Sequence, residues 1–169
     1  MKYSRPVRRL HSILAFLITI QLVLGFSFAK GIINTDWVIT LHKSFGVLTT
    51  IAIFLLVIIR IFSRKPTYPK PLPKIQIIVA RLVHLGIYIS ALGMALSGLI
   101  GSMLMNSSWN FFFIIPFPQM LKTDFSLGMQ IFSYHYIFAS ILLILILMHI
   151  AAALFHQFIL KDDIIARIK

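Results

Sequence analysis

Six histidines are the residues of this chain most able to do chemistry, since it contains no cysteine. Three of them, His135, His149 and His156, lie in one apolar run between Tyr134 and Phe158. A run of about 25 residues, rising 1.5 Å per residue, crosses a hydrocarbon layer of about 30 Å as a single helix. An imidazole in that layer loses its hydration, so each intramembrane histidine is a candidate for function.

The spacing of His135 and His149 indicates what that function is. Fourteen residues separate them, so on a helix they lie within about 40° of one face and about 21 Å apart along the axis. One helix then presents an imidazole near each membrane surface. This arrangement suits two haems stacked across a bilayer, each taking one axial nitrogen from this helix and one from another. The absence of cysteine excludes iron–sulfur clusters and thioether-linked haem.

The composition is that of a membrane protein. The chain has 169 residues, 59 % of them hydrophobic, with a mean hydropathy of +0.95. A net charge of +12 would suggest a nucleic-acid partner for a soluble protein. Here the basic residues flank apolar runs, where membrane topology and anionic lipid account for them. We therefore expect membrane lipid and no nucleic acid as partner.

The hydropathy pattern predicts an all-α membrane protein, a single domain over residues 1–169 that forms a four-helix transmembrane bundle. The expected spans are residues 10–29, 38–62, 76–105 and 129–159. The basic N-terminus resembles a signal peptide, but the apolar run is too long and lacks a cleavage site. Residues 63–74 contain four prolines and predict a surface loop. Residues 106–128 are aromatic and broken by proline, which predicts a segment lying along the interface.

Basic residues are distributed unequally between the two sides of this topology. Three lie on one side, namely Lys30, Lys43 and Lys122. Thirteen lie on the other: Lys2, Arg5, Arg8, Arg9, Arg60, Arg64, Lys65, Lys70, Lys74, Arg81, Lys161, Arg167 and Lys169. The positive-inside rule then predicts that both termini are cytoplasmic.

This orientation assigns a depth to every histidine. His42 and His135 are the only histidines near the outer surface, so they form the only available pair there. Four histidines lie towards the inner surface: His11, His84, His149 and His156. Geometry favours His11 with His149, because His149 mirrors the depth of His135 and His11 opens the first span as His42 opens the second. His84 remains a substitute for His11.

Several charged or titratable side chains have more than one interpretation. His84 and His156 either line a quinone pocket, bond a haem propionate or lie at the interface. Lys43, with Lys30 and Lys122, either steers an anion such as superoxide towards the outer pair or extends its ammonium to the headgroups. Three arginines are expected to anchor lipid or propionate: Arg60, Arg64 and Arg81.

Four segments carry a resemblance to a known family. They are His11 after the basic N-terminus, LHKSFG at residues 41–46, HLGIYISALGMALSGL at 84–99 and HYIFASILLILILMHIAAALFH at 135–156. The chain resembles the bacterial cytochrome b561 family of small di-haem membrane proteins. The resemblance implies two haem b groups with paired histidine ligands: His42 and His135 for the outer haem iron, His11 and His149 for the inner one.

The resemblance also implies electron exchange with the quinone pool in the bacterial inner membrane. In one activity of this family, superoxide gives its electron to the outer haem and ubiquinone is reduced. Other members relay electrons for partner dehydrogenases. We therefore expect a di-haem b oxidoreductase that oxidises superoxide at the periplasmic face and reduces ubiquinone, a superoxide oxidase. The alternative is a cytochrome b subunit between a partner dehydrogenase and quinone. A haem-free transporter is disfavoured by the small size and the lack of an inverted repeat.

Overall fold

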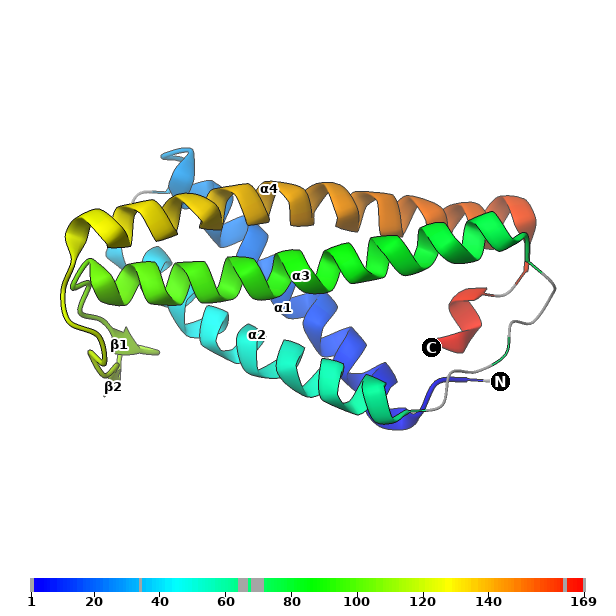
Figure 1. The fold of residues 1–169 in the computed structure, drawn as a ribbon, viewed down its shortest axis with the longest axis horizontal. Coiled ribbons are helices and arrows are strands. Elements are labelled where there is room, and N and C mark those ends of the chain that lie inside the picture. The colour runs from blue at the N-terminus through cyan, green and yellow to red at the C-terminus, as the bar shows by residue number, and fades with distance from the viewer. Residues whose placement is uncertain (1, 34, 64–66, 68–71, 163, 169) are drawn as a thin grey trace.

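The computed structural model describes residues 2–33, 35–63, 67, 72–162 and 164–168 (Figure 1). Its four long helices are α1 (Arg5–Ala29), α2 (Asp36–Phe62), α3 (Lys74–Leu104) and α4 (Phe125–Phe155). The short elements are β1 (Asn110–Phe111), β2 (Ile115–Pro116), the π-helical turn η1 (His156–Leu160) and the 3₁₀ turn η2 (Ile164–Arg167). All four long helices have the length and composition to cross a membrane. The predicted four-span all-α membrane bundle is confirmed.

Local sequence explains where these helices begin. Pro6 lies in the first turn of α1, where a missing backbone N–H costs nothing. Asp124 caps α4, and its Oδ1 accepts a hydrogen bond from the Leu127 N–H at 2.9 Å. Because of this cap, α4 begins four residues earlier than the predicted residue 129. The predicted loop at residues 63–74 lies largely outside the described residues.

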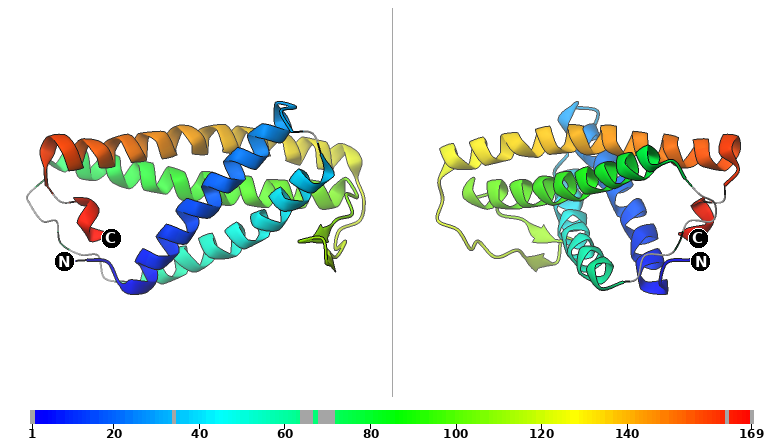
Figure 2. Two further views of the ribbon diagram at one scale, coloured as in Figure 1. Left: turned by 180° about the vertical axis from the view of Figure 1, so that it is seen from behind. Right: turned by 45° about the vertical axis from the view of Figure 1, so that its right-hand side comes forward.

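The bundle consists of two helical hairpins that cross each other. α1 packs along α2 and α3 packs along α4, while α2 contacts α3 over a shorter length. Figures 1 and 2 show the α1–α2 hairpin running obliquely to the nearly parallel axes of α3 and α4. Both chain termini lie at one end, which we call the termini end. The opposite end carries β1 and β2, and we call it the hairpin end (Figure 1).

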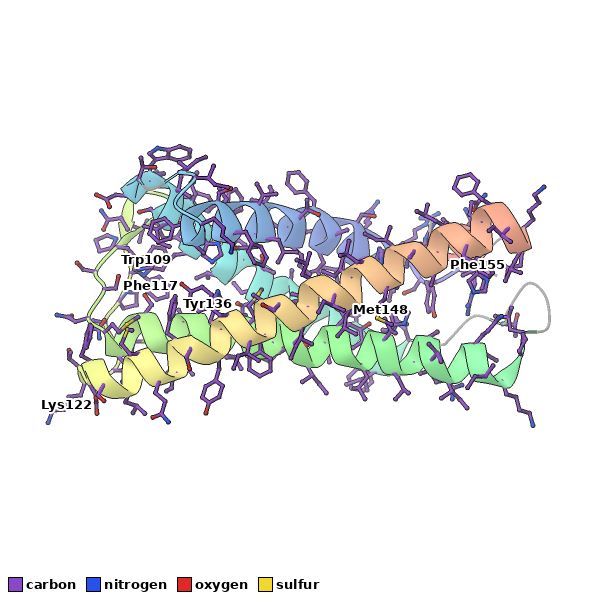
Figure 3. The ribbon with its side chains drawn as sticks, turned by 90° about the horizontal axis from the view of Figure 1, so that it is seen from above. Trp109, Phe117, Lys122, Tyr136, Met148 and Phe155 are labelled. Carbon is purple, nitrogen blue, oxygen red and sulfur yellow. The ribbon has the colours of Figure 1, made fainter. Side chains whose placement is uncertain are left out.

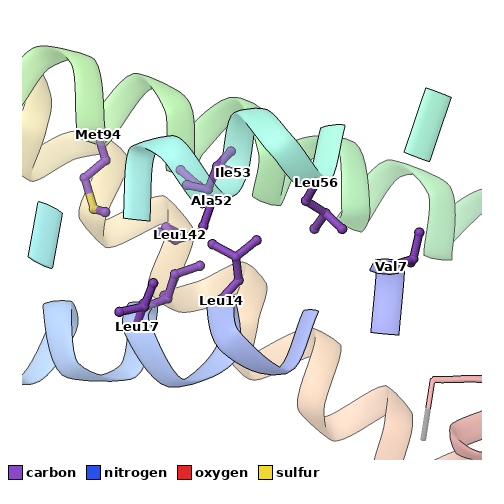
Figure 4. Packing of buried hydrophobic residues seen from close by; sticks show 10 residues of the cluster. Val7, Leu14, Leu17, Ala52, Ile53, Leu56, Met94 and Leu142 are labelled. Carbon is purple, nitrogen blue, oxygen red and sulfur yellow. The ribbon is translucent and has the colours of Figure 1, made fainter. Parts of the chain in front are cut away.

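An apolar layer joins the two hairpins between these ends (Figure 4). Its centre is Leu142 of α4, which is fully buried and lies midway in sequence between His135 and His149. Side chains from the other three helices surround it in one cluster: Leu14, Leu17, Ile18, Ala52, Ile53, Leu56, Ala91 and Met94. Many large apolar side chains on the outside of the helices are exposed, and only Gly128 and Leu142 of α4 are buried. Such an apolar exterior is suited to lipid.

The connection between α3 and α4 folds over the hairpin end. Residues Asn110 and Phe111 pair with Pro116 and Ile115 in a two-stranded antiparallel ribbon. The N–H of Phe112 donates to Ser44 Oγ of α2 at 2.9 Å. The ring of Phe112 also meets that of Phe45 edge-on, with centroids 5.2 Å apart. The segment predicted to lie along the interface therefore has defined contacts with α2.

Candidate functional site

At the hairpin end the structure brings His42 of α2 next to His135 of α4. Their ring centroids are 6.0 Å apart and their planes are 84° apart. A histidine nitrogen lies about 2 Å from a metal it binds, as at zinc, and its ring centre about 1 Å farther back. Two imidazoles on opposite sides of one metal ion therefore have centroids about 6 Å apart. The His42–His135 separation fits a shared iron.

A cavity of about 300 Å³ lies beside these two rings. All four helices contribute to its wall, which includes Gly25 of α1, Gly46 of α2 and Gly98 of α3. The Gly25 and Gly98 backbones lie directly against the His42 and His135 rings, which occupy the space that a side chain at either position would need. The Nδ1 atom of His42 is buried and has no hydrogen-bond partner among the described residues. A mostly apolar pocket with two convergent imidazoles has the character of a cofactor site.

Polar side chains gather at the same end of this cavity. Lys43 Nζ donates to Ser107 Oγ at 2.5 Å and lies 5.9 Å from the ring centre of Trp109. Trp109 stacks on Phe117 with centroids 4.5 Å apart, and Figure 3 shows both rings at the hairpin end. Ser102 Oγ, also on the cavity wall, is buried without a partner among the described residues. An ammonium and two hydroxyls fit the carboxylates of a haem edge.

Two neighbours hold the histidines of the hairpin end in place. His135 Nδ1 donates to the Met94 carbonyl of α3 at 2.7 Å, which leaves Nε2 for a metal. Gln21 of α1 is buried, and its Nε2 donates to the His42 carbonyl at 2.7 Å. Sequence reasoning missed Gln21. Its signal was available, because it is the one amide side chain of an apolar membrane helix and needs a partner there.

At the termini end, His149 of α4 lies between two other histidines. Its ring centroid is 6.3 Å from that of His11 of α1 and 4.9 Å from that of His84 of α3. Only the first separation fits two ligands of one iron by the criterion of about 6 Å. His84 Nδ1 donates to the Ala80 carbonyl of its own helix at 2.6 Å. The structure thus places His84 beside the predicted inner pair rather than in place of His11.

Arg60 of α2 is a cation near enough to this second cluster for its charge to act on the cluster. Its charge acts electrostatically on His11, His84 and His149. The guanidinium carbon also lies 5.1 Å from the ring centre of Tyr3. A guanidinium matches a carboxylate well, as the predicted role of Arg60 as a propionate anchor requires.

The remaining predicted residues lie apart from both clusters. His156 Nδ1 bonds to Asp162 Oδ2 at 2.5 Å, and Asp162 is only 4 % exposed. Arg81 is exposed, as are Lys30 and Lys122. Arg64 lies outside the described residues. Within the described ranges, no group of three or more His, Cys, Asp or Glu side chains is arranged to hold a bare metal ion. Pairs of histidines suit a metal whose other ligands come from a macrocycle.

Comparison with known proteins identifies the family of this chain. The family model for prokaryotic cytochrome b561 matches residues 2–169. The chain belongs to the prokaryotic cytochrome b561 family. It is therefore a haem b-binding electron-transfer protein of a bacterial membrane, and the predicted family is confirmed.

Two curated relatives of this cytochrome b561 cover most of its length. A protein of Yersinia pestis named "Probable superoxide oxidase CybB" is 28 % identical over 132 residues, which are 78 % of this chain and 74 % of the relative. Cytochrome b561 homolog 1 of Escherichia coli (strain K12) is 30 % identical over 128 residues, which are 75 % of this chain and 71 % of the relative. The ring separations and the cavity fit haem b in this chain.

Proposed function

We propose that this cytochrome b561 is a superoxide oxidase that transfers electrons to ubiquinone. His42 and His135 would hold one haem b, and His11 and His149 would hold a second. The observation that carries the proposal is the presence of one histidine pair at each end of the bundle, with centroids 6.0 and 6.3 Å apart. The name of the Yersinia pestis relative supports superoxide as the electron donor. Each haem b, when bound, supplies one-electron redox chemistry.

The numbers of electrons in the proposed reaction fit a protein with two one-electron haem groups. Two superoxide anions each lose one electron and become dioxygen. One ubiquinone gains two electrons and two protons and becomes ubiquinol. A path of single-electron groups connects these two reactions, which differ in electron number.

At the hairpin end, the position of Lys43 favours an anionic substrate. Its ammonium lies at the wall of the cavity that His42 and His135 also line. A cation at the entrance of a low-dielectric cavity raises the local concentration of a small anion such as superoxide. The exposed Lys30 and Lys122 belong to the same side in the predicted topology. We therefore place superoxide oxidation at the hairpin end and assign that end to the periplasm.

The middle of the bundle separates the two histidine pairs by an apolar layer. Leu142 lies between His135 and His149 on α4, and its side chain is fully buried. The layer excludes water and keeps α4 in register with the other helices, so the two pairs hold their relative positions. The separation of 14 residues along one helix corresponds to about 21 Å.

We place ubiquinone at the termini end, which the excess of basic residues assigns to the cytoplasm. His84 is the first candidate for contact with the quinone headgroup. Its ring lies beside that of His149 and is not needed to pair with it. His156 is the second candidate, although its Nδ1 already bonds to Asp162. The His156 Nε2 atom makes no hydrogen bond to another described residue.

The first experiment is a dithionite-reduced minus air-oxidised spectrum of the purified protein, with a pyridine haemochrome assay. We expect two low-spin b haems per chain. A steady source of superoxide with a soluble ubiquinone should then form ubiquinol, one for every two superoxide anions consumed. One haem per chain would contradict a histidine pair. Two haems with no ubiquinol, in protein that co-purifies with a dehydrogenase, would favour the relay subunit instead.

A further inference from the structure

Two glycines lie against the histidine rings of the hairpin end. A Cβ atom added at Gly98 of α3 would lie 2.6 Å from His135 Nδ1 and 2.9 Å from its Cε1. A Cβ atom added at Gly25 of α1 would lie 2.9 Å from His42 Cε1. Real Cβ atoms essentially never approach another heavy atom so closely. Each ring therefore occupies space that any other residue would take for its side chain.

We propose that Gly98 and Gly25 are positioning residues that set the orientation of His135 and His42 towards the iron of the hairpin-end haem. The inference rests on the proposed role of these histidines as its axial ligands. Each of the two helical hairpins contains one such contact. Gly25 and His42 face each other across α1 and α2, and Gly98 and His135 across α3 and α4.

Gly98 acts together with a hydrogen bond. His135 Nδ1 donates to the carbonyl of Met94, which lies one helical turn before Gly98 on α3. The imidazole edge can reach this carbonyl only because residue 98 has no side chain. A methyl group at residue 98 would displace Nδ1, weaken the bond to Met94 and turn Nε2 away. Such a hydrogen bond fixes the tautomer of a ligand histidine and increases its basicity.

Gly25 acts on His42 only by leaving room for its ring. His42 Nδ1 has no hydrogen-bond partner among the described residues, so no bond is lost when the ring moves. The contact is also longer, at 2.9 Å against 2.6 Å. Gly25→Ala should therefore change the same haem as Gly98→Ala, but by a smaller amount.

Gly93 provides a matched control on the same helix. A Cβ atom added there would lie 2.7 Å from the Phe138 ring of α4, a contact as close as that of Gly98. Phe138 is part of the apolar packing and binds no metal. If these glycines serve only helix packing, Gly93→Ala and Gly98→Ala should have the same consequences.

The test uses the purified holoprotein of the wild type, Gly98→Ala, Gly25→Ala and Gly93→Ala. We expect Gly98→Ala to raise the midpoint potential of one haem, because a less basic imidazole stabilises the oxidised iron less. We also expect it to alter the low-spin resonances of that haem and to allow carbon monoxide to bind the reduced protein. Gly25→Ala should show the same changes at lower amplitude. Gly93→Ala should lower the thermal unfolding temperature and leave both haem spectra unchanged.

His135→Ala separates the assignment of the axial ligands from the positioning role of the glycines. If this variant retains both low-spin haems, the ligand assignment is wrong. If it loses one haem while Gly98→Ala has the spectra and potentials of Gly93→Ala, the ligands are right and the positioning role is wrong. If Gly98→Ala does not accumulate, Gly25→Ala is compared with Gly93→Ala in its place. Haem spectra of Gly25→Ala that match those of Gly93→Ala would again overturn the inference.

Discussion

The pairing at the termini end can be tested by removing each of the two histidines that flank His149. We expect His11→Ala to lose one haem and His84→Ala to keep both. The reason is geometric. The His11 and His149 centroids are 6.3 Å apart, which fits a shared iron, whereas His84 at 4.9 Å is too close to leave room for one.

The expected magnitude is a halving of the haem-to-protein ratio in His11→Ala. The pyridine haemochrome assay measures this ratio directly, and the reduced-minus-oxidised spectrum shows whether the remaining haem is low-spin. His84→Ala should retain a ratio of about two per chain, with at most a small shift in one potential, because His84 is packed against His149. The unfolding temperature of each variant reports any general loss of structure.

His156→Ala is the control for this experiment. His156 is bonded to Asp162 and belongs to neither cluster, so this variant should keep both haems. The reasoning is refuted if His84→Ala loses one haem while His11→Ala retains two. That result would mean that the helices hold His84, not His11, at the distance an iron requires.

Three further predictions concern other contacts. Lys43→Gln should lower the rate of ubiquinone reduction by superoxide a few-fold at low ionic strength and weaken its salt dependence; equal rates and salt slopes would exclude steering. Gln21→Leu removes the interhelical hydrogen bond to the His42 carbonyl and should lower the free energy of unfolding in detergent by about 1 kcal/mol. An unchanged denaturant midpoint would contradict this prediction. Asp162→Asn weakens the bond to His156 and should make the C-terminal segment easier to cleave with protease while both haems remain; resistance equal to wild type would contradict it.

The sequence by itself determined the four spans and the family. A membrane helix must satisfy its own backbone hydrogen bonds, so hydropathy along the chain is enough to locate it. The spacing of His135 and His149 predicted one imidazole near each end of the bundle, because both lie on one helix whose geometry is known. His42 was the only available partner for His135, and the structure brings these two rings together. Their role as ligands remains a prediction.

Only the tertiary structure decided relations that depend on how helices rotate and cross. Residue spacing on separate helices does not say whether His11 or His84 lies 6.3 Å from His149. For the same reason, the sequence left Gln21 unnoticed and gave no contact for Gly25. It also gave no partner for Asp162, which the structure buries against His156. Hydropathy is a local property and locates each helix along the chain, but the packing of side chains between helices determines which functional groups meet.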